Sequence, residues 1–268
     1  IFMNIKELIE KYGDTNENWL ILEFLLKKSL IELKLDLQFC IDDIYDSFLD
    51  IIEKRKAHYP LQYIFGNWEF YGLELFVDES ALIPRFETEI LVDEILNLDC
   101  KKDKILDIGC GTGAISLSLA SNLENSTIYG IDISEKAVNL SNKNKEKLHL
   151  KNVNFFESDI FSNVKEKDFD IIVSNPPYID EAEMKTLERE LSFEPQNALY
   201  GGKDGLFFYR EIIGNSLEYL SEMGVLAFEI GYNQMEVISE MLIEKGFKIL
   251  VAKKDFAGFD RILIAKRG

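Results

Sequence analysis

A short apolar segment, Lys104 to Ile108, runs directly into a loop with glycine at every second position and then into a helical stretch, Ala114 to Leu123. The G-x-G-x-G spacing differs from the G-x-G-x-x-G/A of dinucleotide sites, but glycine permits the same close approach of a backbone to a ligand. In open parallel sheets, ligands bind at the carboxyl ends of the strands. The segment therefore predicts an α/β fold with a ligand site at this loop. Its candidate residues are Asp107, Gly109, Cys110, Gly111, Thr112 and Gly113.

Two further predicted strands also end in acidic residues. The segment Thr127 to Asp132 ends about twenty residues past the glycines, where a carboxylate can accept hydrogen bonds from both hydroxyls of a ribose. A helix is expected from Glu135 to Leu148, with Ser134 as its N-cap. The next strand ends at Asp159, which suits contact with an adenine amino group. Together the strand ends predict a nucleoside pocket with Asp132, Ile133, Asp159 and Ile160 as further cofactor-binding candidates.

The tetrapeptide Asn175-Pro176-Pro177-Tyr178 follows the apolar run 169–174 and would lie at the carboxyl end of that strand. Each proline fixes its own φ and restricts the residue before it, so the Asn side chain and the carbonyls are held in one direction. By itself, the tetrapeptide is equally compatible with a strand followed by a simple proline turn. With the nucleoside pocket upstream, it predicts a preorganised hydrogen-bond acceptor.

These motifs in this order resemble the class I S-adenosylmethionine-dependent methyltransferases, where such a tetrapeptide marks enzymes that methylate a planar nitrogen. The resemblance implies a seven-stranded Rossmann-like sheet with the last strand antiparallel. It also implies S-adenosylmethionine as cofactor and S-adenosylhomocysteine as product. Asn175 and Pro176 would each accept one N–H of the acceptor nitrogen, and Tyr178 would pack on its flat face. The catalytic candidates are Asn175, Pro176 and Tyr178; the same three with Pro177 are the substrate-binding candidates, and Asn175 also borders the cofactor.

Five further segments closely resemble the release-factor glutamine methyltransferases, the HemK/PrmC family, over nearly the whole chain. Members methylate the side-chain amide nitrogen (N5) of the glutamine in the Gly-Gly-Gln motif of class I peptide chain release factors, and the resemblance implies that activity and those partners here. One position departs from the pattern, because Phe86 stands where the family usually has a second proline. The segments are 60–66, 83–89, 194–206, 229–234 and 255–261.

The acidic composition of the chain helps to distinguish this family from other classes of protein. The chain carries 48 acidic and 30 basic residues, a net charge of −18, whereas nucleic-acid binders usually need a basic surface. An adenine-N6 or other nucleic-acid amino-nitrogen methyltransferase stays open as the alternative, since it would share the tetrapeptide. A nicotinamide-dependent oxidoreductase would need a different glycine spacing. A non-catalytic cofactor-binding protein would have no reason to keep the tetrapeptide.

The chain is long enough for two domains. Apolar residues at helical spacing predict an N-terminal helical domain, residues 3–60, which we expect to dock the partner protein. A hairpin linker, residues 61–80, leads to the methyltransferase domain, residues 81–268. Within it, the pattern after the active-site loop predicts a helix over Leu206 to Met223, a strand over Val225 to Ile230, and two more strands after a further helix.

Several expectations are negative. The three cysteines and two histidines have no ligand-like spacing, so no metal site is expected. No apolar run approaches the ~20 residues needed to span a bilayer, and we expect a cytoplasmic protein that is a monomer without direct nucleic-acid contacts. The sequence leaves open whether four charged residues line the site or only anchor loops: Arg85, Glu87, Glu194 and Glu229.

Overall fold

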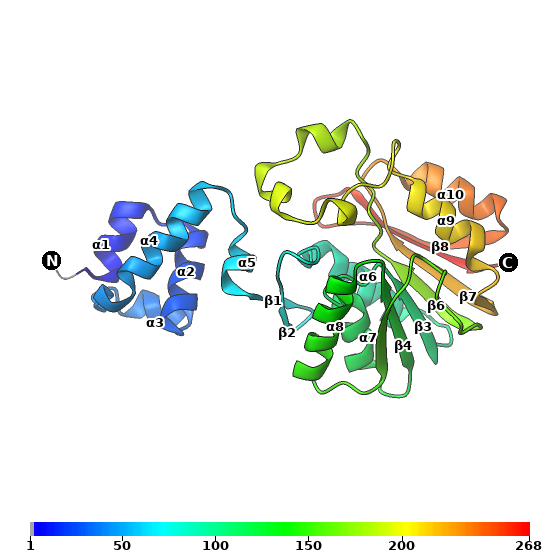
Figure 1. Ribbon diagram of the computed structural model, residues 1–268, viewed down its shortest axis with the longest axis horizontal. Helices are drawn as coiled ribbons and strands as arrows, with labels where there is room; N and C mark the ends of the chain where they lie inside the picture. The colour runs from blue at the N-terminus through cyan, green and yellow to red at the C-terminus, as the bar shows by residue number, and fades with distance from the viewer. Residues whose placement is uncertain (1–2) are drawn as a thin grey trace. The chain divides into compact units, whose positions relative to one another are not determined.

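The computed structural model describes residues 3–268, and its contacts divide the chain into two compact units between Phe65 and Gly66. The N-terminal unit is helical, as predicted (Figure 1). An Asn4–Glu7 capping box starts its first helix, in which each side chain bonds the other residue's backbone N–H. Buried Ile5, Leu22 and Phe48 pack in its core. Its helices are α1 (Ile5–Tyr12), α2 (Asn16–Leu26), α3 (Leu30–Leu35), α4 (Asp42–Lys56) and α5 (Leu61–Phe65).

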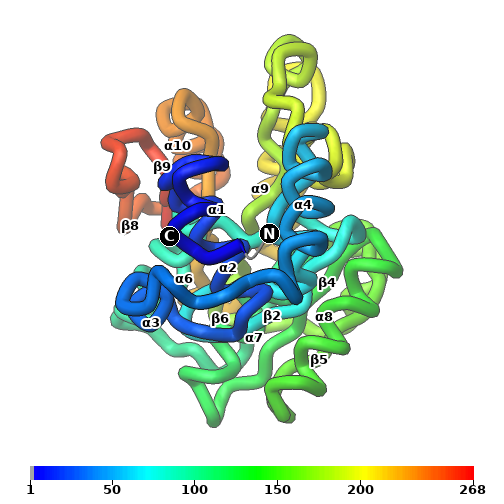
Figure 2. The backbone as a smooth tube through the Cα atoms, turned by 90° about the vertical axis from the view of Figure 1, so that its left-hand side faces the viewer, coloured from blue at the N-terminus to red at the C-terminus, as the bar shows by residue number. Residues whose placement is uncertain are grey.

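Among the described residues, the second unit contains a seven-stranded sheet in the order β5-β4-β3-β6-β7-β9-β8. Strands β3 to β7 pair in parallel, whereas β9 is antiparallel to both β7 and β8. The prediction of a sheet whose last strand is antiparallel is confirmed. Strands β5 and β8 form its opposite edges (Figure 2). The strands are β3 (Lys104–Ile108), β4 (Thr127–Asp132), β5 (Val153–Glu157), β6 (Phe169–Ser174), β7 (Leu220–Glu229), β8 (Phe247–Lys254) and β9 (Asp260–Arg267).

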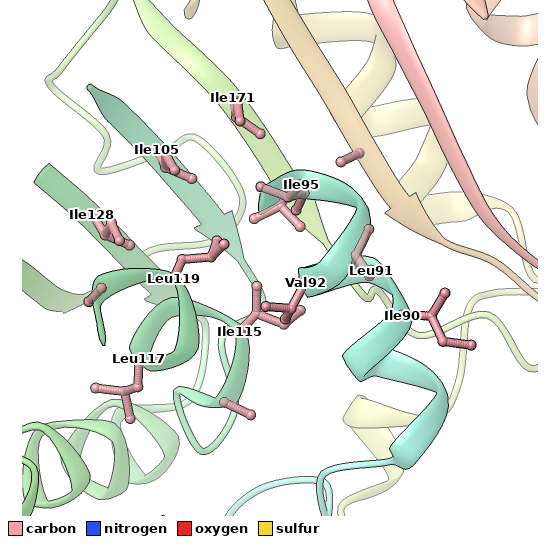
Figure 3. Close-up of a cluster of buried hydrophobic side chains, with 14 of the residues drawn as sticks. Ile90, Leu91, Val92, Ile95, Ile105, Ile115, Leu117, Leu119, Ile128 and Ile171 are labelled. Carbon is pink, nitrogen blue, oxygen red and sulfur yellow. The ribbon is translucent and has the colours of Figure 1, made fainter. Parts of the chain in front are cut away.

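Helices cover both faces of this sheet (Figure 1). On one face, α6 (Phe86–Asn97) and α7 (Ala114–Asn122) pack Leu91, Ile95 and Leu119 onto Ile105 and Ile171 (Figure 3). On the other face, α9 (Phe207–Ser216) and α10 (Met235–Glu244) cover the alternate side chains of the same strands. The central strands are buried on both faces, which explains their continuous apolar sequence. Helix α8 (Glu135–Lys147) lies beside β5.

The hairpin of β1 (Asn67–Phe70) and β2 (Leu73–Phe76) belongs to the second unit. Buried Asn144 of α8 holds it against the glycine loop. The Asn144 Oδ1 accepts from the Phe76 N–H at 2.6 Å, and its Nδ2 donates to the carbonyls of Phe76 at 3.1 Å and Thr112 at 2.9 Å. One side chain thus satisfies backbone groups of two segments that border the candidate site.

The predicted helix over Leu206 to Met223 is wrong in its second half. Helix α9 ends at Ser216, and β7 begins at Leu220, five residues before the predicted strand. Leu220 is buried and pairs with Phe169 of β6, and a register shift separates that pair from the regular ladder that starts at Val225. Strand pairing therefore overrides the local helical pattern. Within the described residues, no helix has the length and apolar character needed to cross a bilayer.

Candidate active site

The glycine loop joins β3 to α7 with positive φ at each glycine: 75° at Gly109, 56° at Gly111 and 84° at Gly113. Other residues rarely adopt such angles. A Cβ at Gly109 would face open space, whereas one at Gly113 would lie 3.0 Å from atoms of both Leu117 and Phe155. Gly109 therefore leaves the loop open toward a ligand, and Gly113 allows α7 to pack closely.

Asp132, at the end of β4, is tied to the same loop. Its Oδ2 accepts from the Gly111 N–H at 2.9 Å, and its Oδ1 accepts from the Ser134 N–H at 2.9 Å. Burial raises the pKa of this carboxyl, and the backbone N–H groups of Ser134 and Gly111 act in the opposite direction. Each carboxylate oxygen has a second lone pair, so both can accept one more hydrogen bond from a ligand.

The carboxyl ends of β3, β4, β5 and β6 border one cavity. The turn after β5 brings Asp159 and Ile160 to it, and Ile160 has a φ of 48°. The Ser158 hydroxyl stabilises this turn by donating to the Ile160 carbonyl at 2.8 Å. The cavity joins most of the predicted residues: Gly109, Cys110, Gly111, Thr112, Asp132, Ile133, Asp159, Ile160, Asn175, Pro176 and Pro177.

Two predicted cofactor residues, Gly113 and Asp107, do not line this cavity. Asp107 is fully buried behind the loop, where its Oδ2 accepts from the Ser116 N–H at 3.1 Å and from the Ser116 hydroxyl at 2.6 Å. Its Oδ1 has no partner within the described residues. Burial raises the pKa of Asp107 to about 7, against the opposing hydrogen bonds from Ser116.

A second cavity adjoins the first at the Asn-Pro-Pro-Tyr segment. Asn175, Pro176 and Pro177 line both cavities, together with Arg85, and Tyr178 lines only the second. Leu82 and Ala198 also line both cavities. The rest of the second wall is mostly apolar: Ile179, Leu191, Leu199 and, as an acidic residue, Glu229. The tetrapeptide thus forms the boundary between a cavity with nucleoside-binding features and a smaller apolar one.

The backbone of the tetrapeptide is held by residues far along the chain. Gln234, the N-cap residue of α10, donates from Nε2 to the Tyr178 carbonyl at 3.1 Å and accepts from the Gly231 N–H at 2.9 Å. Gly201 packs so closely that a Cβ there would lie 2.6 Å from the Pro177 carbonyl oxygen and 2.8 Å from the Tyr178 Cα. These glycine and glutamine positions act as supports for the segment.

The structure gives partners to three of the four charged residues whose roles were open, Arg85, Glu194 and Glu229. Glu194 is 4% exposed, and its carboxylate accepts from the Ile83 N–H at 2.9 Å and forms an ion pair with Arg85. This ion pair joins the segment before α6 to the loop after Tyr178. Glu89 Oε1 accepts from the Tyr71 N–H at 2.9 Å, which fixes the hairpin to α6. Glu87 acts on Glu229 through its negative charge.

Thr88 is a site residue that the sequence did not reveal. Its hydroxyl donates to Glu229 Oε2 at 2.6 Å and accepts from Asn175 Nδ2 at 3.2 Å. Burial raises the pKa of Glu229 to about 7, while the hydrogen bond from Thr88 and the charge of Arg261 act against burial. Arg261 also contacts the Tyr178 hydroxyl at 3.4 Å. Thr88 and Glu229 are 141 residues apart, so no local motif marks them as a pair.

The residues present fit a nucleoside-bearing cofactor better than a metal. Open Gly109 and the free lone pairs of Asp132 provide a cradle and hydroxyl acceptors in the first cavity. Within residues 3–268, no group of three or more His, Cys, Asp or Glu side chains could hold a metal ion.

Comparisons with known proteins agree with the fold and cover both units. The model of the methyltransferase small domain matches residues 86–250, and that of the PrmC N-terminal domain matches residues 6–66. A solved methyltransferase from Pyrococcus furiosus has a TM-score of 0.58 at 20% identity, over 84% of this chain and 99% of that one. Fold and site together define a class I S-adenosylmethionine-dependent methyltransferase.

Similar proteins of known name identify the family within this class of methyltransferases. The release factor glutamine methyltransferase of Thermodesulfovibrio yellowstonii is 37% identical over 98% of this chain and 96% of its own length. That of Fusobacterium nucleatum is 49% identical over 81% of this chain, and the match spans 62% of the relative. That of Clostridium botulinum is 42% identical over 83% of this chain and 81% of its own length. The chain belongs to the release factor glutamine methyltransferase family.

Proposed function

We propose that this enzyme transfers a methyl group from S-adenosylmethionine to the side-chain amide nitrogen of the glutamine in the Gly-Gly-Gln motif of class I peptide chain release factors. The observation that carries the proposal is the position of Asn175, Pro176 and Pro177 on the wall shared by the two cavities. A group held in the smaller cavity would meet the cofactor at this wall. Family membership supports the glutamine as the group that enters it.

The cofactor would occupy the first cavity. Asp132 would accept the ribose hydroxyls on the lone pairs that the backbone leaves free. Ile133 and Ile160 would provide apolar contacts beside the base, and Asp159 would accept from its amino group. Gly109, Cys110, Gly111 and Thr112 would form the loop around the cofactor, supported from behind by Asp107 and Gly113.

When bound, S-adenosylmethionine supplies an electrophilic methyl group carried on a sulfonium. The lone pair of an amide nitrogen is delocalised, so the main task of the protein is to orient that nitrogen. The Asn175 Oδ1 and the Pro176 carbonyl would each accept one N–H, and Tyr178 would pack on the flat face of the amide. Positioning of this kind is worth up to about 7–11 kcal/mol in favourable cases, and the two acceptors also stabilise positive charge that develops on nitrogen.

The apolar second cavity favours the protein substrate over a nucleic acid. Its wall contains Leu82, Ile179, Leu191 and Leu199, and the chain has a net charge of −18. Nucleic-acid binders generally use a basic surface to hold phosphate groups, and a strongly acidic chain favours a different partner. We further propose a cytoplasmic monomer that releases S-adenosylhomocysteine and uses the helical unit to dock the release factor.

Mass spectrometry of a treated release factor tests the assignment. A purified class I factor is incubated with the enzyme and S-adenosylmethionine, digested and fragmented. We expect the mass of one methyl group to be added at the glutamine of the Gly-Gly-Gln motif. Methylation at another residue, or none after the enzyme has been shown to bind cofactor, would contradict the proposal.

A further inference from the structure

The Thr88 hydroxyl bonds both the Asn175 amide and the Glu229 carboxylate, and the Asn175 amide also acts on Glu229 directly as a hydrogen-bond donor. The hydroxyl is 2.6 Å from Glu229 Oε2 and 3.2 Å from Asn175 Nδ2. Thr88 is 5% exposed and Glu229 is 2% exposed, so water competes little for these bonds. The three residues come from the first turn of α6, the segment after β6 and the end of β7.

When Glu229 is ionised, donor and acceptor chemistry allows only one direction through this chain of bonds. An ionised carboxylate only accepts, so the single proton of the Thr88 hydroxyl must point at Glu229. The Thr88 oxygen can then only accept from Asn175, which requires the NH₂ group of the amide to face it. The opposite amide orientation would place two oxygens against each other with no proton between them. This reasoning assigns the amide from its partners, since nitrogen and oxygen have similar shapes.

We propose that Thr88 and Glu229 are positioning residues that fix the Asn175 amide with its oxygen turned toward the acceptor nitrogen. The inference rests on the proposed function and specifies how its main acceptor is prepared. With the amide reversed, Asn175 would present N–H groups to the N–H groups of the substrate. The substrate amide would then lose one of its two acceptors and be repelled from the reactive position.

The proposal predicts an effect on the chemical step in particular. Thr88 is among the residues that line the first cavity, but its hydroxyl is engaged by Glu229 and Asn175. Its loss should therefore lower kcat more than it changes the cofactor affinity or the KM for the release factor. Thr88→Val has nearly the same shape without the hydroxyl, whereas Thr88→Ser keeps the hydroxyl and loses only a methyl group.

The experiment compares these two variants of the intact chain with a class I release factor as substrate. Rates are normalised to the number of S-adenosylmethionine-binding sites, so that partial misfolding is corrected. We expect Thr88→Val to lower kcat about 10- to 100-fold, the size of one lost hydrogen bond to a charged network, with a much smaller change in the Kd for S-adenosylmethionine, and Thr88→Ser to keep most of the activity. Equal losses in both variants would show that Thr88 acts only through packing and would overturn the proposal.

A double variant tests whether Thr88 acts through Asn175. In an Asn175→Ala background, Thr88→Val should cause no further loss, because the group that it orients is already absent. A further loss of the same factor would contradict the proposal.

An NMR measurement without substrate separates this inference from the proposed function. A nuclear Overhauser effect between the Asn175 amide protons and the Thr88 methyl protons is expected. Its absence would contradict the proposed positioning of Asn175 by Thr88. If the effect is present but the wild-type enzyme leaves the release factor unmodified, the proposed function fails, whereas the positioning of Asn175 by Thr88 is upheld.

Discussion

The Gly111 N–H donates to the Asp132 carboxylate at 2.9 Å, joining the loop after β3 to the end of β4. This bond connects two of the segments that would contact the cofactor. It also leaves lone pairs on the carboxylate for a ligand.

Asp132→Ala should therefore weaken S-adenosylmethionine binding by roughly 1.5–3 kcal/mol, the range for hydrogen bonds to a charged group, which is about 10- to 160-fold in Kd. Isothermal titration calorimetry measures this directly. Glu135→Ala is a matched control, because this exposed acid lies three residues away and outside the cavity wall. Wild-type affinity in Asp132→Ala would show that the ribose is held elsewhere.

Gly201→Ala should disturb the Asn-Pro-Pro-Tyr segment, because the new Cβ would lie 2.6 Å from the Pro177 carbonyl oxygen. We expect a loss of about 1–3 kcal/mol in the free energy of unfolding, typical of overpacking, and a lower kcat. Chemical denaturation and methyl-transfer rates are the measurements.

Gly214→Ala is the control for Gly201. Gly214 lies in helix α9, and a Cβ there would meet no atom within 4 Å. Alanine should stabilise this helix by about 0.5–1 kcal/mol and leave activity unchanged. Similar effects of both substitutions would contradict the close packing at Gly201.

The rate of transfer should depend on the ionisation of Glu229. Its surroundings contain Thr88, Asn175, Arg261 and Glu87, and burial raises its pKa to about 7. Its charge in turn acts on Tyr178 and Tyr209, whose pKa values are raised mainly by burial. Only the ionised Glu229 carboxylate forces the Thr88 hydroxyl to donate to it, which in turn fixes the orientation of the Asn175 amide. We therefore expect kcat to rise with pH through about 7. Glu229→Gln should remove this step from the pH profile, and its persistence in that variant would assign it to another group.

Asp107 should make the free energy of unfolding fall as pH rises. In the unfolded chain this carboxyl ionises near 3.8, whereas in the fold its pKa is about 7. Between these values the folded state binds more protons than the unfolded state, so stability decreases with increasing pH. The slope from this group is at most about 1.4 kcal/mol per pH unit. Asp107→Asn should reduce the slope between pH 4 and 7 in denaturant titrations, and an unchanged slope would contradict the assignment.

The strand ends of this fold could be predicted because each combines an apolar run with a glycine loop, an acid or the tetrapeptide. Such signals are local, and the structure brings most of them to one cavity. The helix beyond Ser216 was mispredicted, since pairing of Leu220 with Phe169 decides that segment. Thr88 escaped prediction because its partners, Asn175 and Glu229, are distant in sequence.

The most direct test of the account is transfer of labelled methyl from S-adenosylmethionine to a purified class I release factor. Its Gly-Gly-Gln→Gly-Gly-Ala variant and duplex DNA serve as alternative acceptors, and Asn175→Ala enzyme serves as the catalytic control. The account predicts label on the wild-type factor alone, with most of it lost when Asn175 is replaced. Label on DNA, or equal label on both forms of the factor, would contradict glutamine as the acceptor.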